Sequence, residues 1–169
     1  MAIRKIVTLG DETLRKHCKP QEKFDRRLAT LLKDMADTMY KAEGVGLAAP
    51  QVGILRRIAV VDVTEDHSGL LEMVNPEIIE REGEQTGREG CLSVPGRQGV
   101  VTRPMKIKAR FQDRNGDTYE IETEGFEARA ICHECDHMDG ILYTDKVEGE
   151  LRDVHAQDDG EDDPEGSIE

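Results

Sequence analysis

The spacing of hydrophobic and polar positions predicts two helices, one on each side of a group of strands. Residues 24–43 place apolar side chains three and four positions apart, as in Leu28, Leu32 and Met35, which is the spacing of one helix face. Residues 126–138 return to a helical pattern. We therefore expect an amphipathic helix near the N-terminus and a second helix towards the C-terminal end.

The segments between these helices contain alternating or β-branched runs that predict strands. Such runs occupy residues 57–63, 70–74, 76–80, 106–112 and 118–123. Asn115 and Gly116 stand between the last two runs, and Asn-Gly at this place is a strong signal for a β-hairpin. Residues 82–99 hold many glycines and polar residues around a short apolar stretch, and no strand is predicted there. The pattern indicates an α+β protein, with mixed or antiparallel strands around the second helix.

Length and charge divide the chain into a folded part and a tail. The 169 residues fit one domain. The net charge of −13 leaves no basic surface for general nucleic-acid binding. From Asp153 onward there are acidic residues but no lysine or arginine. We expect a folded domain over residues 1–147 and an acidic, disordered tail over residues 148–169.

The chain shows no targeting or membrane signal. No apolar stretch approaches the length of about 20 residues that a membrane helix needs. The first residues lack the apolar region of a secretory signal. The expected location is therefore the cytoplasm, without a membrane partner.

The strongest local motif is the H-E-x-x-H pattern of residues 133–137. His133 and His137 stand four positions apart on the second predicted helix, so both can bind one divalent metal ion. Glu134 can take a proton from a water molecule at that ion. The alternative is a solvent-facing helix that carries the pattern by chance.

A catalytic metal site usually has a third protein ligand, and several candidates are open. The metzincin pattern would need a histidine where Tyr143 stands, which argues against that class. Glu148, Glu150 and Glu161 lie in no apolar helix that would hold them in place. Cys91 lies in a glycine-containing segment, and its thiolate would suit zinc or ferrous iron. The alternative for Cys91 is a buried core cysteine.

Cys132 and Cys135 form a C-x-x-C pattern that overlaps the histidine motif. A structural zinc site would need a second pair, and Cys18 and Cys91 are not spaced as one. On a helix, these two thiols and the two histidines cannot all point at one ion. We interpret Cys132 and Cys135 as packing residues.

A loop of small residues, 44–53, follows the first predicted helix. Gly44 and Gly46 permit close approach of a second backbone, and Val45 offers edge N–H and C=O groups to a peptide. Gln51 carries an amide donor suited to stabilising a developing oxyanion.

Three segments together resemble the motifs of bacterial peptide deformylase, in the same order. They read GVGLAAPQ at residues 44–51, EGCLS at residues 89–93 and HECDH at residues 133–137. The resemblance covers residues 1 to about 147. That family is a group of metal-dependent hydrolases that remove the formyl group from the N-formylmethionyl ends of new proteins and release formate.

The resemblance implies a role for each of these residues. Cys91, His133 and His137 would bind one divalent metal ion, with ferrous iron expected and zinc, nickel or cobalt as substitutes. Glu134 would be the general base and then the acid, while Gln51 and the backbone N–H of Leu92 would hold the oxyanion. The residues implied to contact the substrate are Gly44, Val45, Gly46, Glu89, Gly90, Phe126, Arg129 and Ala130.

The chain departs from the family pattern at several positions. Cys132 stands where glutamine is usual, Cys135 replaces an apolar residue, and Arg129 is apolar in some members. Some members dock on the ribosome through a basic C-terminal helix, and the acidic tail predicts that this mode is absent here. Two other functions stay open at this point. One is a peptidase that cuts internal bonds, and the other is a non-catalytic metal-stabilised or acidic interaction protein.

Overall fold

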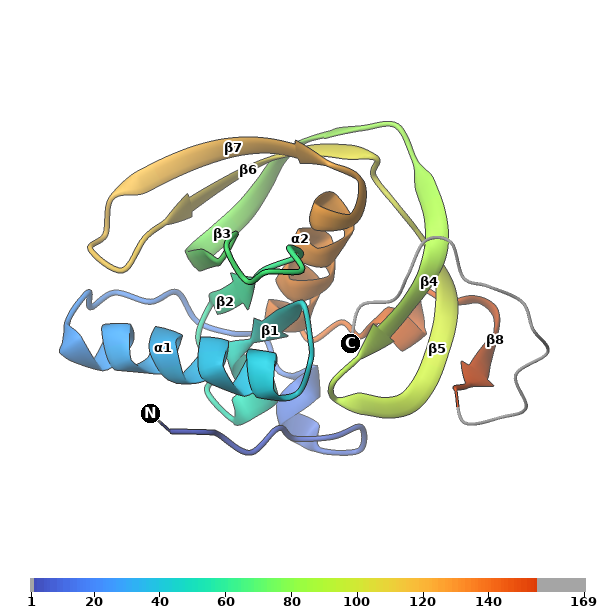
Figure 1. Cartoon of the computed structure of the whole chain (residues 1–169), viewed down its shortest axis with the longest axis horizontal. Helices are drawn as coiled ribbons and strands as arrows, with labels where there is room; N and C mark the ends of the chain where they lie inside the picture. Colours follow the sequence, from blue (N-terminus) through green and yellow to red (C-terminus); the bar gives the residue numbers. More distant parts are fainter. Residues whose placement is uncertain (1, 155–169) are drawn as a thin grey trace.

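The computed structural model of the chain describes residues 2–154 and has an α+β architecture (Figure 1). Its two α-helices are α1 (Arg26–Lys41) and α2 (Gly125–Met138). The strands within these residues are β1 (Gly46–Ala48), β2 (Ile58–Val61), β3 (Leu71–Glu82), β4 (Gln85–Cys91), β5 (Val94–Arg103), β6 (Lys106–Gln112), β7 (Thr118–Glu124) and β8 (Glu148–Asp153).

The strands form two antiparallel sheets. The larger sheet has the order β1-β2-β3-β6-β7, and the smaller sheet has the order β4-β5-β8. The predicted hairpin is confirmed, because β6 and β7 pair along their whole length around residues 113–117. The predicted α+β class with antiparallel strands is confirmed as well.

The two helices cover opposite faces of the strands β1, β2 and β3. Ile58 and Val60 of β2 belong to the same hydrophobic cluster as Leu28 of α1. Ala59 and Val61, which point to the other face, belong to the cluster that contains Ile131 of α2. As a result α2 lies at the centre of the molecule, between the larger sheet and the hairpin of β4 and β5 (Figure 1).

The structure joins two predicted strands into one and forms β4 and β5 where no strand was predicted. The runs at 70–74 and 76–80 form the single strand β3, whose pairing with β6 shifts register between Val74 and Glu77. Asn75 has a φ of 53° at this bulge. β4 and β5 occupy the glycine-rich segment 82–99, where pairing between the two strands outweighs the low strand propensity of glycine.

The folded region extends beyond the predicted boundary at residue 147. Residues 148–153 were expected in the disordered tail, but they form β8, which pairs with β5. Val147 and Leu151 pack against a buried cluster that includes Cys91, so burial of these two apolar side chains favours the strand. The rest of the predicted tail, residues 155–169, lies outside the described residues. No helix within residues 2–154 is long and apolar enough to cross a membrane.

Candidate metal centre

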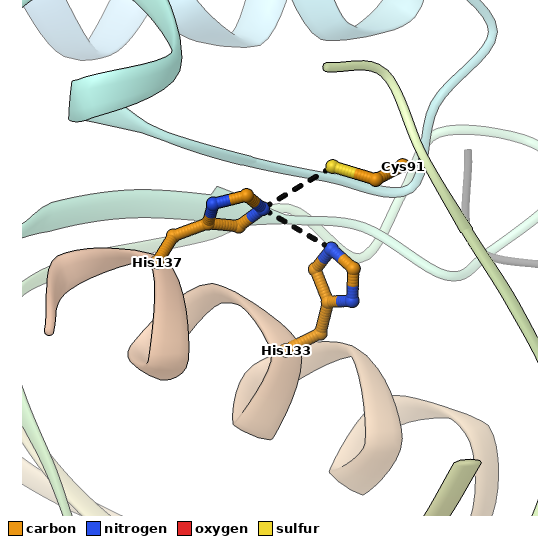
Figure 2. A group of neighbouring side chains, drawn as sticks. All are labelled: Cys91, His133 and His137. Carbon is orange, nitrogen blue, oxygen red and sulfur yellow. Dashed lines mark hydrogen bonds between the residues drawn. The ribbon is translucent and has the colours of Figure 1, made fainter. Parts of the chain in front are cut away.

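Three buried side chains converge between α2 and the end of β4. His133 and His137 project from the same face of α2, and the thiol of Cys91 reaches them from β4 (Figure 2). The Nε2 atom of His137 lies 3.2 Å from the Sγ atom of Cys91 and 3.2 Å from the Nε2 atom of His133. All three ligand atoms lie within 4.8 Å of one another, and no other such group of His, Cys, Asp and Glu occurs in residues 2–154.

The chemistry of these three residues fits a divalent metal ion. One thiolate and two neutral imidazoles form a donor set that zinc and ferrous iron both accept. Burial removes all three from water, and a shared cation would satisfy the lone pairs that face one another. The ring of Tyr143 stacks beside His133, with 6.0 Å between the ring centroids. Tyr143 therefore packs against a candidate ligand, at the position where the metzincin pattern would place a histidine.

Glu89 orients His133 from the side opposite the candidate metal position. Its Oε1 atom lies 2.9 Å from Nδ1 of His133, which leaves Nε2 to face Cys91 and His137. Arg103 donates to both carboxylate oxygens at 2.8 and 2.9 Å, and Arg129 donates to Oε2 at 2.8 Å. Burial alone would raise the pKa of Glu89, but the hydrogen bonds from Arg103 and His133 outweigh it. The pKa of this carboxyl lies well below its ordinary value.

The charged network continues from Glu89 to the surface. Arg103 donates from Nη1 to the carboxylate of Asp136 at 2.5 Å. Lys146, whose side chain is 42% exposed, lies 3.1 Å from the same carboxylate. Charges of opposite sign therefore alternate from the buried Glu89 to solvent, which compensates the burial of each group.

Glu134 directly follows the candidate ligand His133 on α2 and is almost fully buried. In the part of the chain that the structure describes, its Oε1 atom has no hydrogen-bond partner. Burial raises the pKa of Glu134 to about 7, although the charge of His133 opposes this shift. A carboxyl with a pKa near neutrality is suited to taking and returning a proton. Gly46 of β1 lies against this side chain, and a Cβ atom there would meet the carboxylate.

Gln51 links the small-residue loop to the segment that follows Cys91. Its Nε2 atom lies 3.0 Å from the hydroxyl of Ser93 and 3.5 Å from Sγ of Cys91. Its Oε1 atom accepts a hydrogen bond of 2.9 Å from the backbone N–H of Ala48. The side-chain amide is therefore held with its donor end towards the group of Cys91, His133 and His137.

The structure separates the other predicted site residues into two groups. Val45, Leu92 and Phe126 are partly exposed, so they can border a substrate. Glu89, Gly90, Arg129 and Ala130 are buried, as are the backbone positions Gly44 and Gly46.

Cys132 and Cys135 line a separate cavity of about 280 Å³, away from the three candidate ligands. Burial raises the pKa of Cys132 to about 11, which fits a packing role.

Three residues of the site were missed by the sequence analysis: Arg103, Asp136 and Ser93. Arg103 and Asp136 are separated by 33 positions, and no local spacing indicates that they meet. Ser93 adjoins the predicted motif around Cys91, but nothing in the pattern indicated its contact with Gln51.

Within the described residues, a cysteine and two histidines converge, and the helix of the histidines carries a buried glutamate whose Oε1 atom has no hydrogen-bond partner. This is the arrangement of a metal-dependent hydrolase. The family model of polypeptide deformylase matches residues 3–153 of this chain, and the chain belongs to that family. It is therefore an enzyme, and the motif resemblance noted above is confirmed.

Relatives and solved structures agree with this assignment. Peptide deformylase from Agathobacter rectalis is 57% identical over 158 residues, which cover 94% of this chain and 98% of the relative. The crystal structure of a peptide deformylase from Legionella pneumophila aligns with a TM-score of 0.84 and 50% identity, and covers 87% of each chain. A peptide deformylase from Synechococcus elongatus, solved in complex with actinonin, aligns with a TM-score of 0.81 and 39% identity. That alignment covers 85% of this chain and 78% of the other.

Proposed function

We propose that this chain removes the formyl group from the N-formylmethionyl ends of newly made polypeptides by metal-dependent hydrolysis. The observation that carries the proposal is the convergence of Cys91, His133 and His137, with Glu134 next to His133 on the same helix. Among the described residues, the Oε1 atom of this buried glutamate has no hydrogen-bond partner. Hydrolysis adds water across the formyl C–N bond, so that formate leaves with the carbon and the peptide keeps a free amine.

The proposed metal is a single divalent ion held by Cys91, His133 and His137. Ferrous iron is the expected ion, and zinc, nickel or cobalt are the expected substitutes. Such an ion supplies Lewis-acid chemistry, because it lowers the pKa of water and polarises a carbonyl group. The hydrogen bond between Glu89 and His133 supports this arrangement, since it keeps the Nδ1 side of the ring away from the ion.

Glu134 is the proposed proton carrier. Its free Oε1 atom takes a proton from the attacking water and returns it to the nitrogen of the leaving amine. Gln51 is the proposed donor to the negative oxygen that forms on the formyl carbon, together with the backbone N–H of Leu92. The position of the Gln51 amide supports this role, because its Nε2 atom lies 3.5 Å from Sγ of Cys91.

The substrate backbone is proposed to pair with residues 44–46. β1 is an edge strand of the larger sheet, so among the described residues no strand pairs with its outer side. The partly exposed side chains of Val45 and Phe126 are proposed to border the pocket for the methionine side chain, with Ala130 beneath them and Gly90 on the opposite strand.

The proposed place of action is the cytoplasm, where formylated chains are made. Contact with the ribosome is proposed to use a surface other than a basic C-terminal helix, because the residues from Asp153 onward include no lysine or arginine. Salt-sensitive pelleting with ribosomes that depends on residues 155–169 would contradict this part of the proposal.

The test is formate release from N-formyl-Met-Ala-Ser by protein purified without oxygen and loaded with ferrous iron. Wild-type protein is expected to release formate, and Glu134→Ala is expected to keep its metal but lose turnover. A fully active Glu134→Ala variant would remove general-base catalysis from the proposal. Actinonin, which the relative from Synechococcus elongatus binds, is expected to inhibit the release.

A further inference from the structure

Arg129 is buried, and its contacts lead away from a role as a pocket wall. Its side chain is 3% exposed. Its Nη1 atom lies 2.8 Å from Oε2 of Glu89, 3.0 Å from the carbonyl oxygen of Val101 and 3.4 Å from that of Gly87. One guanidinium on α2 therefore binds β4, β5 and the carboxylate that orients His133.

The position of Arg129 on α2 places it in line with the candidate metal ligands. Arg129, His133 and His137 follow one another at intervals of four residues, so they share one helix face. On β4, positions 87 and 89 lie two residues apart, so they share one strand face. The pairing of β4 with β5 shifts register between Glu89 and Cys91, and the contact of Cys91 with His137 shows that Cys91 also lies beside the helix row. Four helical residues advance by about 6 Å and two strand residues by about 6.6 Å, so the two rows keep step from Arg129 to His133.

Each residue of the helix row contacts the strand row. The contacts are Arg129 with Gly87 and Glu89, His133 with Glu89, and His137 with Cys91. The first of these contacts lies at the end of the row farthest from Cys91. A hydrogen bond there fixes how far β4 is displaced along α2, and this displacement decides whether Sγ of Cys91 meets the two imidazoles.

The carboxylate of Glu89 has no remaining capacity for other partners. A carboxylate offers about four acceptor positions. Arg103 fills two of them, while His133 and Arg129 fill one each. Arg103 belongs to β5, holds Glu89 within the β4–β5 hairpin and reaches α2 next to His137 through Asp136. Arg129 binds the hairpin from a position two helical turns earlier on α2, so its removal takes away a contact between hairpin and helix that Arg103 does not make.

We propose that Arg129 is a positioning residue, which sets the register of β4 against α2 and so brings Cys91 to His133 and His137. This inference rests on the proposed metal-dependent function. It assigns Arg129 to the assembly of the metal site, in place of the substrate contact that the family resemblance implied.

The test compares Arg129→Met, Arg129→Lys and the control Arg110→Met, each loaded with zinc. Arg110 lies on β6, where its half-exposed side chain pairs with Glu120, far from the centre in sequence and in sheet order. Three measurements are made on each protein. They are the rate of zinc release to a chelator, the absorption spectrum of the cobalt-substituted form, and kcat and KM for N-formyl-Met-Ala-Ser.

Arg129→Met is expected to hold zinc roughly 10- to 100-fold less tightly, as for other residues that orient a metal ligand. Its cobalt spectrum is expected to change, and kcat is expected to fall more than KM rises. Arg129→Lys keeps one donor for Glu89 and is expected to recover part of the zinc affinity. Arg110→Met is expected to match the wild type in all three measurements.

Unchanged zinc release and an unchanged cobalt spectrum in Arg129→Met, with a raised KM, would overturn the inference and make Arg129 a pocket residue. If Arg129→Met does not fold, the test uses Arg129→Lys instead. Zinc release at the wild-type rate and an unchanged cobalt spectrum in Arg129→Lys would also overturn the inference. Failure of the wild type to bind metal or release formate would instead refute the proposed function itself.

Discussion

The substitution Gly46→Ala tests whether the position of the Glu134 carboxylate controls turnover. A Cβ atom on residue 46 would lie 2.9 Å from Cδ and 3.1 Å from Cγ of Glu134, and closer still to Oε2. Ordinary contacts of a Cβ atom begin at 3.4 Å, so the carboxylate has to move. A displacement on the order of 1 Å of a catalytic group costs about 100-fold in rate. Such a loss corresponds to about 2.7 kcal/mol of transition-state stabilisation.

The assay is a double-mutant cycle of kcat for formate release, with Gly46→Ala, Glu134→Gln and the double variant. Gly46→Ala is expected to lower kcat about 100-fold with its metal retained, since the three atoms nearest to the added Cβ all belong to Glu134. In the Glu134→Gln background the same substitution is expected to cost little, because the carboxylate is already removed. Wild-type kcat in Gly46→Ala, or full additivity in the double variant, would refute this reasoning.

Three further predictions concern the metal, the buried charges and the C-terminal strand. Cys91→Ala is expected to lose bound metal and Cys132→Ala to keep it, as measured by elemental analysis. Full metal content in both variants would exclude Cys91 as a ligand. The depressed pKa of Glu89 stabilises the fold above the ordinary value of 4.5, and this contribution is lost as the pH falls below that value. The unfolding free energy, followed by urea titration, should therefore fall more between about pH 5 and about pH 3 in the wild type than in Glu89→Gln. A larger fall of the unfolding free energy in Glu89→Gln than in the wild type would contradict an ionised Glu89 in the folded state. A chain that ends at Val147 lacks β8, and it is expected to melt at a lower temperature than a chain that ends at Val154. Equal melting temperatures of the two chains would show that β8 does not stabilise the β4–β5 hairpin that carries Cys91.

The parts of the site that were predictable from the sequence are those set by local spacing. His133 and His137 are four residues apart, and helix geometry alone places them on one face. Asn115 and Gly116 mark the hairpin of β6 and β7 in the same local way. Cys91 was one of several open candidates from the residues alone, and only the order of the three motifs selected it.

The parts that were not predictable depend on contacts between distant segments. Nothing in residues 82–99 indicates strands, because their glycines suppress the local preference and pairing between β4 and β5 decides the outcome. Likewise, Arg103 contacts Glu89 and Asp136, which lie 14 and 33 positions away, so no local spacing indicates these contacts. β8 was missed because its acidic sequence continues into the tail, while its pairing partner lies about 50 residues earlier in β5.

The most direct test of the central claim is product analysis of N-formyl-Met-Ala-Ser after incubation with the metal-loaded wild-type protein. Mass spectrometry is expected to find formate and intact Met-Ala-Ser, with the peptide bonds uncut. Cleavage between Met and Ala or between Ala and Ser would identify a peptidase instead. An unchanged substrate, with the metal present in full amount, would contradict the proposed deformylation by this centre.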